Sequence, residues 1–166
     1  MYYIGLDIGG TKCAVCIGEV KDGVLTLIDK EKFATGKGRD PYEVLAELYT
    51  HSVSVLETHG MSFSDIAGIG ISCGGPLDAS RGVILSPPNL PGWDHIEIVK
   101  YFEEKTGVKT YLQNDANACA VAEWKFGAGR DPETGKIVPD PAKFPHGMKY
   151  VSDYIHSKGL KFGMYS

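Results

Sequence analysis

The sequence lacks any long hydrophobic run and any excess of positive charge. No apolar stretch in its 166 residues approaches the roughly 20 residues that a membrane-spanning helix needs. Its net charge is −4, whereas a nucleic-acid-binding protein needs a basic surface to meet phosphates. No basic segment followed by an apolar one precedes the first apolar strand, so we expect no signal peptide. These absences predict a cytoplasmic protein with no membrane or nucleic-acid partner.

Cysteine is also scarce, with four in the chain. Cys13 and Cys16 form a CxxC pair, a spacing that can indicate a metal or redox site. They lie in KCAVCIG, which has the composition of a strand. Residues three apart on a strand point to opposite faces, so the pair is not arranged to share a metal. We therefore expect small buried thiols and no metal-ligand cluster.

The sequence does contain a regular alternation of strands and helices. The hydrophobic fraction of 43% is normal for a packed core. Three strands come first, and strands and helices then alternate, in the order β-β-β-α-β-α-β-α. This order predicts an α/β fold of the ribonuclease-H/actin-like kind, a mixed sheet with flanking helices. The expected strands are 2–8, 12–20, 24–33, 66–72 and 108–113, and the expected helices are 41–59, 95–106 and 115–126.

A loop rich in glycine and proline, FGAGRDPETGKIVP (126–139), follows these elements. It is typical of a hinge within one enzyme, of a disordered tether, or of a join between two unrelated pieces. Met148, Val151 and Ile155 then recur at helical spacing, and residues 160–165 have a strand composition. A tether would not carry this periodicity, so we expect an appended loop-helix-strand unit.

The stretch LDIGGTK is the first candidate site. Gly9 and Gly10 allow backbone N–H groups to approach an anion closely, Thr11 adds a hydroxyl group, and Lys12 adds a charge. Such a turn can hold the phosphates of a nucleotide while Asp7 holds Mg²⁺ directly or through water. The alternative is an ordinary glycine hairpin without a ligand.

A second candidate site combines QNDAN with two turn-rich segments. Asp115 follows a strand and is a candidate general base for a substrate hydroxyl group; the alternative is that Asn114 or Asp115 only caps the next helix. In SCGGPLD, Gly74 and Gly75 allow a turn beside a ligand. In SPPNLPGW, the Asn89 amide is suited to sugar hydroxyl groups. Trp93, in the same segment, either stacks on a sugar or packs in the core, and packing is favoured.

Taken together, these motifs resemble the ROK family of bacterial sugar kinases and repressors, and within it the glucokinases. The resemblance runs from residue 2 to about 129, and NLPGW followed by NDAN is its most specific part. It implies phosphorylation of a hexose 6-hydroxyl group from ATP and Mg²⁺, with Asp115 as the catalytic base. The implied phosphate and magnesium residues are Asp7, Gly9, Gly10, Thr11 and Lys12, and the implied sugar contacts are Gly75, Asn89, Asn114 and Asp115.

The rest of the chain departs from this family. The second glycine-rich phosphate turn, the zinc motif and the adenosine pocket of such kinases do not follow residue 129. Residues 130–166 instead resemble the α-galactosidases, which are TIM-barrel glycoside hydrolases. We therefore expect a chimera of a kinase domain (1–129) and a hydrolase fragment (130–166), with weak activity or none.

Two further expectations follow from this chimera. An inactive structural scaffold is the alternative to a weak kinase, and the join is equally consistent with a natural fusion, a design or an assembly error. Leu160, Phe162 and Met164 share one face of the expected last strand, which predicts self-association through that strand.

Overall fold

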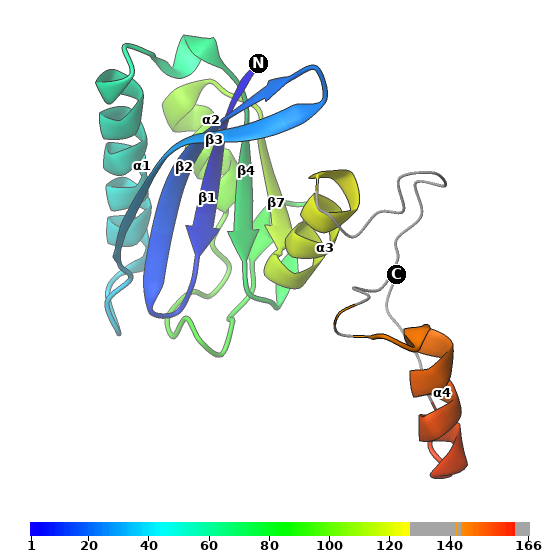
Figure 1. The fold of residues 1–166 in the computed structure, drawn as a ribbon. Coiled ribbons are helices and arrows are strands. Elements are labelled where there is room, and N and C mark those ends of the chain that lie inside the picture. Colours follow the sequence, from blue (N-terminus) through cyan, green and yellow to red (C-terminus); the bar gives the residue numbers. More distant parts are fainter. Residues whose placement is uncertain (127–141, 143, 162–166) are drawn as a thin grey trace. The chain divides into compact units, whose positions relative to one another are not determined.

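The computed structural model describes residues 1–126, 142 and 144–161 (Figure 1). The chain divides into two compact units, Met1–Ala120 and Val121–Ser166. None of the helices in the described part is both long and apolar enough to cross a membrane. The first unit contains the sheet and both candidate sites.

The first unit is built on one five-stranded sheet with the strand order β3-β2-β1-β4-β7. The first three strands form an antiparallel meander, whereas β4 and β7 run parallel to β1. The predicted mixed sheet is therefore confirmed. The strands are β1 (Tyr2–Ile8), β2 (Lys12–Lys21), β3 (Val24–Ala34), β4 (Ile66–Cys73) and β7 (Thr110–Asn114).

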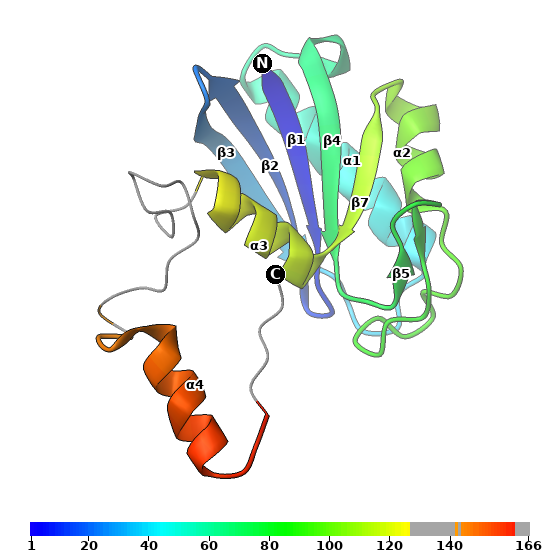
Figure 2. The ribbon, with the colours of Figure 1, turned by 90° about the vertical axis from the view of Figure 1, so that its right-hand side faces the viewer.

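One face of the sheet holds the core. Side chains alternate along β1, so that Ile4, Leu6 and Ile8 are buried on this face. Helix α1 (Pro41–Thr58) covers it, as Figure 2 shows, with a stripe of buried residues that includes Leu45. The predicted start of α1 is confirmed, because the Asp40 side chain accepts hydrogen bonds from the N–H groups of the first turn.

The three parallel strands end together. The register pairs Ile8 with Cys73 and Cys73 with Asn114, so the last residues of β1, β4 and β7 form one row. Each strand is followed at once by a segment that the sequence analysis identified. The sheet therefore brings the turn after Ile8, the turn after Cys73 and the start of helix α3 (Asp115–Phe126) to one edge.

Several short elements on either side of β4 differ from the prediction. A 3₁₀ turn, η1 (Phe63–Asp65), precedes β4, and a short hairpin of β5 (Leu77–Asp78) and β6 (Val83–Ile84) follows it. Helix α2 (Ile98–Thr106) starts later than the expected residue 95. The reason is that His95 has a φ of 54° and Ile96 exchanges two backbone hydrogen bonds with Ile84.

The second unit contains helix α4 (Gly147–Ser157), which confirms the helical stripe predicted beyond the loop. The predicted strand over 160–165 lies mostly outside the described residues, and Leu160 and Lys161 are not in a strand. The glycine- and proline-rich loop also lies outside the described residues, apart from Phe126 at the end of α3. The expected self-association through residues 160–165 stays a prediction.

Candidate functional site

The turn between β1 and β2 offers unused donors beside a carboxylate. The Gly9 N–H donates to the Lys12 carbonyl at 3.1 Å, which closes the turn. Among the described residues, the N–H groups of Gly10 and Thr11 find no acceptor. Asp7, near the end of β1, is exposed. Free backbone N–H groups can donate hydrogen bonds to phosphate oxygens, and an exposed carboxylate can coordinate Mg²⁺. These residues therefore fit the two groups that the sequence predicts.

The segment that carries Asn89 lies directly on this turn. A Cβ built on Gly10 would overlap the Asn89 carbonyl oxygen. The segment is folded on itself, with Leu90 N–H donating to Pro87 O at 2.9 Å and Trp93 N–H donating to Leu90 O at 3.2 Å. Trp93 is only 2% exposed, so its ring packs in the core and is not available to stack on a sugar.

The two predicted sugar amides face the same glycine turn. A Cβ built on Gly74 would lie 3.4 Å from both the Nδ2 and Oδ1 atoms of Asn89, and one on Gly75 would lie 3.3 Å from Asn114 Nδ2. Gly74 therefore lies beside the Asn89 amide and Gly75 beside the Asn114 amide. A side chain at position 74 would be in ordinary contact with Asn89, whereas one at position 75 would be tight against Asn114.

Asn114 and Asp115 stand where β7 passes into α3. The Ala116 N–H donates to Asn114 Oδ1 at 3.1 Å and to Asp115 Oδ1 at 2.8 Å, so both side chains contribute to capping. Asp115 is nevertheless exposed, and each carboxylate oxygen can accept more than one hydrogen bond. Capping therefore does not prevent Asp115 from accepting a proton.

Cys73, the last residue of β4, is buried at this edge of the sheet. Its thiol is fully buried, and burial raises its pKa to about 12, with smaller contributions from Asp115, from Cys13 and from Asp7. Asp7 precedes the last residue of β1, and Asp115 directly follows the last residue of β7. The strand register therefore brings both residues to this edge of the sheet.

The CxxC pair does not form a site. Cys13 is buried opposite Ile8, as expected, whereas Cys16 lies opposite Gly5 on the other face of β2 and is only half-buried. Burial raises the pKa of both thiols, which keeps them protonated and chemically quiet.

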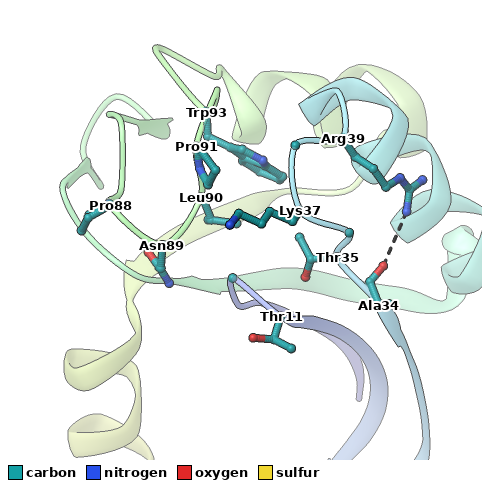
Figure 3. Close-up of a pocket in the computed structure, with 13 residues that line it drawn as sticks. Thr11, Ala34, Thr35, Lys37, Arg39, Pro88, Asn89, Leu90, Pro91 and Trp93 are labelled. Atoms are coloured by element: carbon teal, nitrogen blue, oxygen red, sulfur yellow. Dashed lines mark hydrogen bonds between the residues drawn. The ribbon is translucent and has the colours of Figure 1, made fainter.

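A pocket of about 450 Å³ joins the turn of residues 9–12, the predicted phosphate turn, to the segment 87–93, the Asn89 segment. Lys12 lies outside it and lines another hollow, with Lys32 and Phe33. Asp7, Gly75, Asn114 and Asp115 also lie outside its lining. The lining residues are Gly10, Thr11, Ala34, Thr35, Gly36, Lys37, Gly38, Arg39, Pro88, Asn89, Leu90, Pro91 and Trp93, and Figure 3 shows them.

The segment 34–39 is the part of this pocket that the sequence analysis missed. Thr35, which is 3% exposed, fixes it to the phosphate turn. Its N–H donates to Thr11 O at 3.0 Å, and its hydroxyl donates to Gly9 O at 2.6 Å. The available signal was TGKGR, two glycines around a lysine just after a strand.

Comparison with known proteins gives two matches along the chain. The model of the ROK family matches residues 3–137, and that of Alpha galactosidase A matches residues 109–166. Over 43 residues the chain is 58% identical to "Probable alpha-galactosidase B" of Aspergillus clavatus, which covers 26% of this chain and 10% of that protein. The α-galactosidase resemblance of the C-terminal region is thus confirmed over a short segment.

The kinase resemblance covers the first unit. The Glucokinase of Thermotoga maritima is 30% identical over 127 residues, which are 76% of this chain and 38% of that protein. The crystal structure of the ROK hexokinase from Thermus thermophilus is 36% identical with a TM-score of 0.64, over 76% of this chain and 39% of that one. The chain thus spans well under half the length of these relatives, and its fold is the actin-like fold of ROK sugar kinases. Because the family match extends over most of its residues, the chain belongs to the ROK family.

Proposed function

We propose that the edge formed by β1, β4 and β7 is the sugar-binding half of a site for ATP-dependent phosphorylation of a hexose 6-hydroxyl group. One observation carries the proposal: the Gly74-Gly75 turn lies beside both the Asn89 and the Asn114 amides, and Asp115 directly follows Asn114. Amides around a narrow backbone turn suit neighbouring sugar hydroxyl groups, which both donate and accept hydrogen bonds. Glucose is the sugar we expect, because the curated relatives include glucokinases.

The residues at this edge have different proposed roles. The Asn89 and Asn114 side chains orient the sugar, and Asp115 accepts the proton of the attacking hydroxyl group. The N–H groups of Gly10 and Thr11 hold phosphoryl oxygens, assisted by Gly9 and Lys12, while Asp7 would hold Mg²⁺ directly or through water. When bound, ATP supplies the transferred phosphoryl group and Mg²⁺ neutralises its charge.

We further propose that the chain is a chimera with a boundary near residues 129 and 130, and that its activity is weak. The pocket beside the phosphate turn is lined from three short segments of the first unit alone. A kinase gains most of its rate by positioning both substrates and excluding water, which needs a second wall. In the sequence, residues that match α-galactosidases occupy the place where the second domain of a kinase would begin.

The experiment is a coupled assay of ADP release with glucose and Mg-ATP. We expect slow, glucose-dependent turnover, far below the roughly 10 s⁻¹ of an ordinary enzyme. Asp115→Asn should reduce it by about 10²- to 10⁴-fold, the usual contribution of a general base. Asp22→Asn, in the exposed β2–β3 hairpin, is the matched control and should leave turnover unchanged.

An inert structural chimera is the second candidate, favoured by the hydrogen bonds that already engage Asn114 and Asp115 in capping α3. It predicts no glucose-dependent ADP release and no glucose binding. Turnover at the rate of an ordinary kinase would contradict the proposed weak activity. Turnover that is unchanged in Asp115→Asn would show that Asp115 is not the catalytic base.

A further inference from the structure

Lys37 stands at the tip of a turn that faces the phosphate turn across the pocket. Gly36 and Gly38 flank it with φ of 79° and 76°, a conformation that favours glycine. Figure 3 shows the Lys37 side chain extending across the pocket toward Asn89 and Leu90. Arg39, the other cation of this segment, points away and donates to the Ala34 carbonyl.

This turn is held at both ends. On one side, the Thr35 N–H and hydroxyl bind the phosphate turn. On the other side, Arg39 Nη1 lies 2.7 Å from Glu47 Oε2 on α1, and the Arg39 N–H donates to Gly36 O at 3.3 Å. Because its backbone is fixed from two directions, Lys37 projects from a defined position, and a ligand need order only its side chain.

The charge balance of the pocket is uneven. Glu47 and Glu43 on α1 offset the charge of Arg39. Lys37 has no ion pair or hydrogen bond with any residue that the structure describes. No Asp or Glu is present among the residues that line the pocket. The pocket therefore presents one uncompensated positive charge, opposite the free N–H groups of Gly10 and Thr11, an arrangement that attracts an anion.

We propose that Lys37 binds the phosphoryl group at the junction of donor and sugar, as a positioning residue that acts with Gly10 and Thr11. This inference rests on the proposed function, because Asn89 on the far side of the pocket is a proposed sugar contact. The group that Lys37 would bind is a phosphate monoester or a terminal phosphate, which either the phosphorylated hexose or the nucleotide can provide. A lysine at this point favours both charge neutralisation and correct orientation.

The test is a set of NMR titrations that follow the backbone amides of Gly10 and Thr11, which detect weak binding. Glucose 6-phosphate, inorganic phosphate, Mg-ATP and glucose are added separately to the full chain. Lys37→Met should weaken binding of the phosphate-bearing probes about three- to tenfold, as expected for one partly exposed charged contact, and leave glucose binding unchanged. Lys37→Arg, which keeps the charge, should recover most of the affinity.

The matched control is Lys21→Met, which removes the same charge from an exposed position at the other end of β2. A loss confined to glucose 6-phosphate supports the product as the source of the phosphoryl group, and a loss confined to Mg-ATP supports the donor. The proposal is overturned if wild type binds none of the three anions, or if Lys37→Met and Lys21→Met weaken them equally. Failure of the proposed function has a different signature: glucose does not bind wild type, although inorganic phosphate binds in a manner that depends on Lys37.

Discussion

Gly10 and Asn89 approach so closely that a Cβ on Gly10 would overlap the Asn89 carbonyl oxygen and lie 3.0 Å from the Asn89 Cβ. Gly10 belongs to the phosphate turn, and Asn89 is the proposed sugar contact of its segment. The distance between the two parts of the proposed site is therefore set by the absence of a side chain at position 10.

Gly10→Ala should separate these two parts. Gly10 does not have a positive φ, so the cost comes from the overlap with Asn89 and not from backbone strain. Overpacking of this kind destabilises a protein by about 1–3 kcal/mol. Gly70→Ala is the matched control, since a Cβ there would meet nothing within 4 Å. Urea denaturation compares the two variants, and equal free energies of unfolding would show that the close approach has no energetic consequence.

Thr35→Val tests how firmly segment 34–39 is attached to the phosphate turn. Valine keeps the shape of threonine but removes the hydroxyl that donates to Gly9 O at 2.6 Å. The Gly9 carbonyl is only partly buried, so leaving it without this donor should cost about 1 kcal/mol, the low end of the range for an unsatisfied buried group. Thr26→Val, at an exposed position in β3, removes a hydroxyl with no such partner and should be neutral. Chemical denaturation of both variants makes the comparison, and a neutral Thr35→Val would mean that water replaces the lost bond.

Sequence patterns predicted correctly those elements that are determined by contacts between residues close together in the chain. The alternation in β1 and the Asp40-Pro41 pair fix a strand and a helix start by contacts within a few residues. The convergence of Asp7, Gly75 and Asn114 was also predictable, because parallel strands bring whatever follows them to one edge.

The features that the sequence did not predict depend on contacts between segments that are distant in the chain. Nothing within TGKGR indicates that Thr35 bonds to Gly9 and so brings Lys37 over the pocket. The β5–β6 hairpin has only two residues in each strand, too few for an alternation to be recognised. The burial of Trp93 likewise follows from the tertiary fold of its loop, and its sequence allowed two readings.

The four cysteines should differ sharply in reactivity. With iodoacetamide at pH 8, we expect Cys119 to be alkylated first because it is exposed, and Cys13 and Cys73 to react only after unfolding. Mass spectrometry of the modified peptides measures this order. Rapid alkylation of Cys73 in the folded protein would contradict the burial that raises its pKa to about 12.

The same pKa shift predicts a direction for stability at alkaline pH. The Cys73 thiol stays protonated in the folded protein, whereas in the unfolded chain it ionises near its ordinary pKa of 9.0. The folded state therefore holds more protons, and the free energy of unfolding should fall as pH rises from about 9 toward 12. Cys73→Ala should flatten this fall relative to Cys119→Ala, as measured by urea denaturation at pH 8 and pH 10.5.

Asn89→Ala should weaken glucose binding and spare the fold. Asn89 is exposed, and its amide faces Gly74 without a hydrogen bond to another described residue, so its removal leaves no buried group unpaired. Each sugar hydrogen bond contributes about 0.5–1.5 kcal/mol, so loss of one or two should reduce the affinity by about two- to 150-fold. Thr26→Ala is the control, an exposed polar residue of β3 outside both candidate sites. Calorimetric titration with glucose measures both variants. If Thr26→Ala lost as much affinity as Asn89→Ala, the sugar would not be held in the arrangement proposed for this edge of the sheet.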